Sequence, residues 1–264
     1  MKKKISITID DNTLHDVDSM IDGIYIRNRS QAIEYMVKNQ IGESKTAVIL
    51  AGGKEKIQKI GSEYRPTIKV SGTPVIERAL KKLKKNGYKE IYVIARHHIL
   101  TKIFEIIKEG SMYGMKVHYV EEKDAKGSAD SLKLLKGKIK SNFLVVFADI
   151  IFDKININEL WKQHIKQSPV ATLILTTSGT PSKKGIVKIE GSKILEFIQK
   201  PNKSDAYLGF SSMFIAGPEI FEYSGKSLEE DIFPILAKKG LLQGHLSSEK
   251  ETHIHTKADS MKSI

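Results

Sequence analysis

The sequence predicts an α/β protein in which a small N-terminal module precedes a larger, doubly wound domain. Three observations predict this: a short alternating strand followed by two helical segments, a change of pattern near residue 45, and a regular alternation of strands and helices thereafter. With 264 residues the chain is long enough for roughly two domains. We therefore expect one domain at residues 1–43 and a second at residues 46–264.

The first element is a short strand at residues 4–9. Isoleucine occupies every second position and polar residues lie between, which is typical of a strand with one buried face. No second strand follows before the helical segments, although a lone strand cannot satisfy its backbone edge or bury its apolar face. We therefore expect this strand to pair with the same strand of a second copy, giving a homodimer or a higher even oligomer.

Two helices are expected after this strand. Asp10 or Asp11 can cap the first helix, and Gly23 marks its end. Ser30 is the expected N-cap of the second helix, which runs along one apolar side as far as Gly42.

Over residues 1–42 the chain resembles the ribbon-helix-helix family of DNA-binding regulators. The resemblance rests on the strand at 5–9 and the helix junction at 27–33. It implies that two chains intertwine and place their paired strands in the major groove of double-stranded DNA, at a palindromic operator. It further implies base contacts from Lys4, Ser6 and Thr8 and phosphate contacts from Arg27, Arg29 and Ser30. A solvated strand face and an ordinary helix cap are the alternative interpretations of these residues.

The net positive charge of the chain does not lie in this N-terminal module. The formal net charge is +12, yet residues 1–44 contain six Lys and Arg against seven Asp and Glu. The positive excess therefore belongs to the second domain, where a solvated lysine-rich surface is the commonest explanation and a nucleotide or flanking DNA the alternative.

Composition excludes several classes of protein. The chain has no cysteine, which excludes a disulfide framework, a thiolate metal site and a thiol nucleophile. The start is an alternating strand rather than a signal peptide, and the longest apolar stretch, 143–152, is too short to cross a bilayer. We expect a soluble cytoplasmic protein with no membrane partner.

The second domain alternates strands and helices in order. Strands are expected at residues 46–50, 89–95, 115–120, 142–152 and 170–177, and helices at 74–86, 102–108, 128–135 and 157–167. Short strands at 185–190, 194–199 and 207–215 and a helix at 228–239 complete the chain. This order predicts a mostly parallel mixed sheet with helices on both faces.

Polar landmarks follow three of the expected strands. Gly52 and Gly53 end the first strand, Asp149 lies near the end of a very apolar strand, and Lys200 ends a later one. Ligands bind outside the carboxyl ends of strands in such sheets, and glycine lets a ligand approach the backbone. Each residue alone is also explained by a turn or a cap.

Over about residues 46–264 the chain resembles the sugar-phosphate nucleotidyltransferases, also called NDP-sugar pyrophosphorylases. Six segments carry the resemblance in the family's order, at 47–53, 65–77, 127–129, 145–149, 194–201 and 227–234. It implies a Rossmann-like, doubly wound domain that joins a nucleoside triphosphate to a sugar 1-phosphate and releases pyrophosphate, with Mg²⁺ as cofactor. By position it implies nucleotide binding by Ala51, Gly52, Gly53, Arg65 and Gly127, catalysis by Asp149 and Lys200, and metal binding by Asp149.

Three features depart from the family's pattern: a loop, a lysine and an aspartate. In the loop after Gly53 the family has glycine and arginine where this chain has Glu55 and Ile57, and Thr67 replaces a lysine. Arg65 or Lys69 could supply the missing positive charge.

The third departure concerns the second metal-binding aspartate of the family. His253 occupies its place, with His255 on the same strand face. The two histidines are either metal ligands or a surface pair, and Mg²⁺ prefers oxygen ligands.

These departures favour a DNA-binding transcriptional regulator whose second domain binds a nucleotide, sugar phosphate or nucleotide sugar with little turnover. The alternative is an active sugar-1-phosphate nucleotidyltransferase whose N-terminal module binds DNA or dimerises. A third possibility is an assembly module that binds no ligand.

Overall fold

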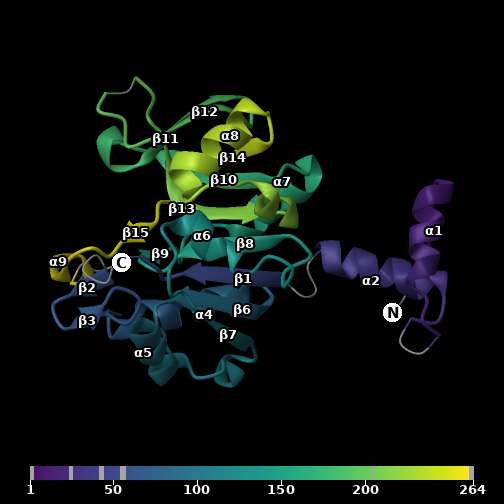
Figure 1. Ribbon diagram of the computed structural model, residues 1–264, viewed down its shortest axis with the longest axis horizontal. Helices are drawn as coiled ribbons and strands as arrows, with labels where there is room; N and C mark the ends of the chain where they lie inside the picture. The colour runs from purple at the N-terminus through teal and green to yellow at the C-terminus, as the bar shows by residue number, and fades with distance from the viewer. Residues whose placement is uncertain (1–2, 24–25, 42–44, 54–57, 204, 262–264) are drawn as a thin grey trace. The chain divides into compact units, whose positions relative to one another are not determined.

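The structure is a computed structural model that describes residues 3–23, 26–41, 45–53, 58–203 and 205–261 (Figure 1). The chain divides into two compact units, Met1–Glu43 and Ser44–Ile264. Among the described residues, no helix is both long enough and apolar enough to span a bilayer.

The first unit contains helices α1 (Asp11–Ser19) and α2 (Arg29–Ile41). The side chain of Asp10 accepts a hydrogen bond from the Thr13 amide at 3.1 Å, so Asp10 is the N-cap of α1. The prediction that Ser30 caps the second helix is wrong. The side chain of Asn28, two residues before Ser30, accepts a hydrogen bond from the Gln31 amide at 3.0 Å. Helix α2 begins at Arg29, so Ser30 already lies inside it.

The strand expected at residues 4–9 does not form within the described chain. These residues have no regular secondary structure, and the side chains of Ile5 and Ile7 are 74% and 52% exposed. The physical reason is the missing neighbour, because a strand forms only when a second strand completes its hydrogen bonds. Of the hydrophobic side chains described in this unit, Val17 and Ala32 are the buried ones.

The second unit is built on a nine-stranded mixed sheet with the order β10-β14-β12-β11-β13-β8-β1-β6-β7. Its strands are β1 (Lys45–Leu50), β6 (Tyr88–Ala95), β7 (Lys116–Glu121), β8 (Phe143–Phe147), β10 (Ala171–Thr177), β11 (Gly185–Glu190), β12 (Lys193–Gln199), β13 (Leu208–Ala216) and β14 (Leu242–Leu246). Strands β8, β1, β6 and β7 are parallel, and their carboxyl ends therefore meet at one edge.

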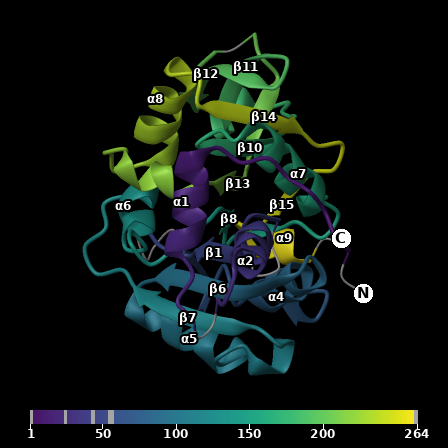
Figure 2. The same cartoon turned by 90° about the vertical axis from the view of Figure 1, so that its right-hand side faces the viewer.

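Helices cover both faces of this sheet. They are α4 (Val75–Lys85), α5 (His97–Ile107), α6 (Ser128–Lys133), α7 (Ile157–Gln167) and α8 (Phe233–Lys238), with α9 (Lys257–Ser260) near the end. Helices α4, α5 and α7 pack in one hydrophobic core with Ala47 and Ile49, whereas α6 and α8 pack in another with Val48 and Leu50. Figure 2 shows α6 and α8 on one side of the sheet and α4 and α7 on the other. The continuous apolar run of β1 follows from burial on both faces.

The expectation of a mostly parallel sheet is wrong for the later strands. Strands β11, β12 and β13 pair antiparallel with their neighbours, and of the pairs outside the first four strands only β10–β14 is parallel. Two residues, Gly191 and Ser192, separate β11 from β12, with Gly191 at a φ of +58°. Such a short connection permits only a hairpin, which forces antiparallel pairing.

Short elements interrupt two expected ones. The strand expected at 142–152 is divided into β8 and β9 (Ile150–Ile151), and β9 pairs with β15 (Thr252–His253). The helix expected at 228–239 begins as a wide π turn, Leu228–Ile232, before α8. The remaining short strands are β2 (Lys59–Ile60), β3 (Glu63–Tyr64), β4 (Lys69–Val70) and β5 (Thr73–Pro74).

Candidate functional site

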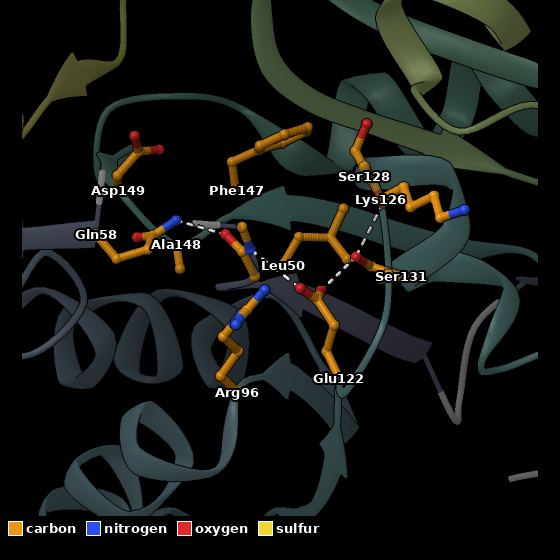
Figure 3. Close-up of a pocket in the computed structure, with 14 residues that line it drawn as sticks. Leu50, Gln58, Arg96, Glu122, Lys126, Ser128, Ser131, Phe147, Ala148 and Asp149 are labelled. Carbon is orange, nitrogen blue, oxygen red and sulfur yellow. Dashed lines mark hydrogen bonds between the residues drawn. The ribbon is translucent and has the colours of Figure 1, made fainter. Parts of the chain in front are cut away.

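A cleft of about 430 Å³ lies where the four parallel strands end. Each strand contributes a residue at or directly after its carboxyl end: Leu50 from β1, Arg96 after β6, Glu122 after β7 and Phe147 from β8. Figure 3 shows these side chains around the opening. The position agrees with the general rule for ligand sites in such sheets.

The predicted glycine pair forms one wall of this cleft. A Cβ atom on Gly52 would lie 2.0 Å from Oε2 of Glu122, so no larger residue fits without displacing that carboxylate. Gly53 has a φ of +110°, a conformation that other residues rarely adopt. Gln58 donates from Nε2 to the Gly52 carbonyl oxygen at 2.5 Å and fixes the turn from the other side. Ala51 precedes this turn, and its amide donates to Ile94.

Glu122 is a buried acid that the sequence reasoning missed. Its Oε1 accepts a hydrogen bond from the Gly53 amide at 3.2 Å, and its Oε2 accepts one from the Ser131 hydroxyl. Figure 3 shows Glu122 and Ser131 joined in this way. The available signal was its place directly after a strand, which its charged neighbours, Glu121 and Lys123, obscured.

Gly127 lines the opposite side of the cleft. A Cβ atom there would lie 2.5 Å from the carbonyl oxygen of Lys226, so packing between two loops requires glycine whatever the ligand. The neighbouring Ser128 hydroxyl donates to Glu229 at 2.7 Å, which ties the same two loops together. The predicted nucleotide contact of Gly127 stays a prediction.

Asp149 lies at the mouth of the cleft, in the turn between β8 and β9. Nη1 of Arg65 donates to Oδ2 of Asp149 at 3.0 Å, and both side chains are mostly buried, at 14% and 19% exposed. Arg65 is therefore the cation beside Asp149, and its replacement of the family's lysine stays a prediction. Lys69 is exposed on β4, and Thr67 donates its hydroxyl to the Tyr64 carbonyl at 3.0 Å.

The two histidines lie beside Asp149. Strand β15 places His253 opposite Ile150, and the Ile254 amide donates to the Asp149 carbonyl at 2.8 Å. One potential ligand atom from each of Asp149, His253 and His255 lies within 4.8 Å of the other two. Burial lowers the pKa of His255, although the nearby Asp149 carboxylate acts in the opposite direction.

A second buried acid, Glu251, lies behind these histidines. Burial alone would raise its pKa, but hydrogen bonds from His253, Lys184 and Ser211 lower the pKa to about 2. Nε2 of His253 lies 3.0 Å from Oε1 of Glu251 and donates to it. The sequence reasoning did not identify Glu251, whose position in a charged run gave no sign of burial.

Lys200 lies at the end of β12 with a φ of +48° and an exposed side chain. Its amide donates to the carbonyl of Lys184 at 3.0 Å, so its backbone adjoins a residue that contacts Glu251. Lys200 does not line the cleft, and its predicted sugar-phosphate role stays a prediction. Residues 54–57, where Glu55 and Ile57 depart from the family's pattern, and Gly42 lie outside the described residues.

The candidate DNA-binding residues belong to the first unit. The side chains of Lys4, Ser6 and Thr8 are exposed, as are those of Arg27 and Ser30. Arg29 forms an ion pair with Asp18 at 2.6 Å, which joins α2 to α1 and lowers the pKa of Asp18. The charge of Arg29 is therefore already balanced within the unit. The DNA contacts expected of these six residues stay predictions.

Comparison with known proteins agrees with this geometry. A family model described as nucleotidyl transferase matches residues 46–252. The chain belongs to the nucleotidyl transferase family. The match begins after the N-terminal unit.

Relatives within the family include sugar-phosphate nucleotidyltransferases. The chain is 25% identical over 186 residues to the mannose-1-phosphate guanylyltransferase catalytic subunit beta of Danio rerio, covering 67% of this chain and 51% of the relative. It is 28% identical over 218 residues to a UTP–glucose-1-phosphate uridylyltransferase of Synechocystis, covering 74% and 56%. The chain thus spans about half the length of the curated relatives it matches.

A solved structure supports the fold. It is a Bacillus anthracis protein assigned as a glucose-1-phosphate thymidylyltransferase, crystallised with sucrose. The TM-score is 0.70 at 22% sequence identity, and the match covers 82% of this chain and 92% of the other. The mixed α/β fold predicted for the second domain is confirmed by this likeness.

Proposed function

We propose that the second unit joins a nucleoside triphosphate to a sugar 1-phosphate and releases pyrophosphate. The observation that carries this proposal is the cleft at the parallel sheet edge, which is lined by the glycine turn and by Asp149, the partner of Arg65. The sugar-phosphate specificities in the names of the relatives agree with it. The function expected first, a sensor with little turnover, becomes the alternative.

The chain's own residues would act by positioning and by charge. An oxygen of the sugar phosphate attacks the α-phosphorus, and a new P–O bond forms as the bond to the β-phosphate oxygen breaks. The pyrophosphate leaves with that electron pair. Arg65, oriented by Asp149, would bind phosphate oxygens, and the turn fixed by Glu122 would admit the nucleotide to the backbone of Gly52 and Gly53.

The magnesium ion that the family implies fits these residues poorly. Mg²⁺ prefers oxygen ligands in near-octahedral geometry, whereas the donors beside Asp149 are two imidazoles. In addition, one oxygen of Asp149 is held by the Arg65 guanidinium. Asp149 and the two histidines, with Arg65 beside them, are therefore poorly suited to hold Mg²⁺.

Pyrophosphate release tests this proposal. The protein is incubated with each nucleoside triphosphate and a panel of sugar 1-phosphates, in Mg²⁺, Mn²⁺ or Zn²⁺. We expect release with at least one pair, a loss of at least 100-fold in Asp149→Ala, and an unchanged rate in the matched control Asp153→Ala. Asp153 pairs with Arg78 outside the cleft. Calorimetric nucleotide binding without release in any mixture would instead favour a sensor.

We further propose that the first unit pairs with a second copy and binds double-stranded DNA. The observation that favours this is the exposure of Ile5 and Ile7 in a unit whose described residues include very few buried apolar side chains. A domain of about 40 residues seldom buries enough surface to fold without a partner. Pairing of residues 4–9 would cover the isoleucines and leave Lys4, Ser6 and Thr8 free to meet base edges.

Binding to DNA from the protein's own upstream region tests this second proposal. We expect a specific site whose affinity falls at least tenfold when Lys4, Ser6 and Thr8 are replaced together by alanine, with the dimer intact by light scattering. The matched control replaces Lys116, Ser111 and Thr101, exposed residues of the second unit. Equal binding to every sequence, abolished by salt, would leave only phosphate electrostatics.

A further inference from the structure

The donor set beside Asp149 is rich in nitrogen. One carboxylate and two imidazoles lie with their ligand atoms within 4.8 Å of one another, on a turn and a short strand joined by backbone hydrogen bonds. A tetrahedral Zn²⁺ ion with bonds of about 2.1 Å sets its ligands roughly 3.4 Å apart. The rings of His253 and His255 are stacked, with centroids 5.2 Å apart and planes at 17°, so these side chains must rotate to bring the three donors to ligand distances.

Glu251 prepares His253 as a ligand. Its buried carboxylate accepts the Nε2 proton of His253, which leaves the lone pair on Nδ1. Nδ1 is buried and has no hydrogen-bond partner among the described residues. A carboxylate behind a metal-binding histidine fixes the tautomer and increases the basicity of the imidazole. Lys184 and Ser211 hold Glu251 in turn, so the arrangement is rigid.

Local charge disfavours a hard ion at the same place. Arg65 lies 3.0 Å from Asp149 and cancels most of the attraction that its carboxylate would offer to a cation. Binding must then depend on coordinate bonds from the imidazoles rather than on net charge. Imidazole suits Zn²⁺, Co²⁺ and Ni²⁺, whereas Mg²⁺ keeps to oxygen and water.

We propose that Asp149, His253 and His255 form a site for a divalent transition metal of the Zn²⁺ class, with Glu251 as a positioning residue. The site has three protein ligands and leaves a fourth position open, the arrangement typical of catalytic rather than structural zinc. This inference deepens the proposed function, since the site lies at the mouth of the same cleft. It does not require turnover, because the metal alone can be titrated.

Calorimetric titration of the full-length, metal-free protein with Zn²⁺ and with Mg²⁺, in the absence of substrates, tests this site. We expect Zn²⁺ to bind at least 100-fold more tightly than Mg²⁺. His253→Asp should weaken Zn²⁺ binding at least tenfold and narrow the preference over Mg²⁺. Glu251→Gln should weaken Zn²⁺ binding about tenfold, as expected for the partner of a metal ligand.

Two further variants keep the result interpretable. His255→Ala changes an exposed side chain, so it should weaken Zn²⁺ binding while the melting temperature of the metal-free protein stays unchanged. His97→Ala, at a 79% exposed histidine outside the cluster, is the matched control and should bind Zn²⁺ normally. Co²⁺ in place of Zn²⁺ should show the visible absorption of nitrogen-ligated tetrahedral cobalt.

The proposal is overturned if Zn²⁺ and Mg²⁺ bind within tenfold of each other, or if Zn²⁺ binding survives unchanged in both His253→Asp and His255→Ala. Failure of the proposed transferase reaction gives a different result, in which Zn²⁺ binds as expected but no pyrophosphate is released with any metal.

Discussion

At the scale of single residues, Glu122 determines the shape of the glycine turn that forms one wall of the cleft. Its two oxygens accept from the Gly53 amide and the Ser131 hydroxyl, and they occupy the space that a side chain on residue 52 would need. One buried acid thus explains both why the turn is rigid and why its first residue is glycine.

Replacing this acid tests that explanation. In Glu122→Gln one carboxylate oxygen becomes an NH₂ group, so one of the two donors loses its acceptor. Leaving a buried donor unsatisfied costs about 1–3 kcal/mol, and we expect the free energy of unfolding in urea to fall by about that amount. Glu121→Gln, at the exposed neighbouring acid, is the control and should leave it unchanged. Equal stability in both variants would contradict the role of Glu122.

His164 predicts a pH dependence of stability. Its ring is buried in α7, Nδ1 lies 2.9 Å from the Thr172 hydroxyl, and burial lowers its pKa to about 4. The unfolded chain binds a proton near pH 6.5, whereas the fold resists protonation until about pH 4. The contribution is therefore full above pH 6.5 and is lost as the pH falls toward 4, at up to about 1.4 kcal/mol per pH unit.

Denaturant unfolding between pH 7.5 and 4.5 measures this contribution. We expect His164→Asn to remove part of the decline in the free energy of unfolding, although the variant is less stable at neutral pH. A control at an exposed histidine, His97→Asn, should keep the full decline. Parallel pH profiles for the wild type and His164→Asn would contradict the assignment.

At the scale of elements, the pair β9–β15 determines the chemistry of the site. These strands have two residues each, yet they bring residue 253 to residue 150 from about a hundred positions away in the chain. Helix α7 follows β9 closely, and Asn156 caps it by accepting from the Glu159 amide at 3.3 Å. The segment that follows β8 is therefore fixed on one side by the pairing of β9 with β15 and on the other by the capped start of α7.

The cap of α7 can be tested by rescue. Asn156→Ala removes the side-chain acceptor, and we expect the free energy of unfolding to fall by about 1 kcal/mol. Asn156→Ser keeps an acceptor at the same position and should recover most of that loss. Equal stability of the alanine and serine variants, measured by urea unfolding, would show that the cap contributes nothing.

At the scale of the whole molecule, the chain combines two units with very different cores. The second unit has two large hydrophobic clusters, one on each face of its sheet, whereas the described part of the first buries Val17 and Ala32. Burial of apolar surface drives folding, so we expect the second unit to fold by itself and the first to depend on a partner.

Deletion of residues 1–43 separates these contributions. We expect the remaining chain to keep its melting temperature within about 2 °C, since its cores are intact. The molar mass from light scattering should fall from that of a dimer to that of a monomer. A second variant, Ile5→Asp with Ile7→Asp in the chain of 264 residues, should also be monomeric. A dimer that survives both changes would place the interface in the second unit.

The sequence by itself determined most of the long elements of the second unit and the identity of several site residues, but it did not predict β14 or the two-residue strands. Apolar runs buried on both faces and helices with one apolar stripe identify β1, β6 and α7 within about one residue, because these patterns are local. The glycine turn and Asp149 were found in the same way, as polar or small residues directly after buried strands.

Only the tertiary structure decided which side chains meet. The Arg65–Asp149 pair, the burial of Glu122 and Glu251, and the gathering of His253 and His255 at Asp149 each join segments distant in the chain. Hydrophobic periodicity predicts on which face of a helix or strand a side chain lies. It does not predict which residues from distant parts of the chain pack against that face, because this depends on the strand order and on the path of the loops. The same limit applies to residues 4–9, whose spacing predicts an apolar face but does not show what covers that face.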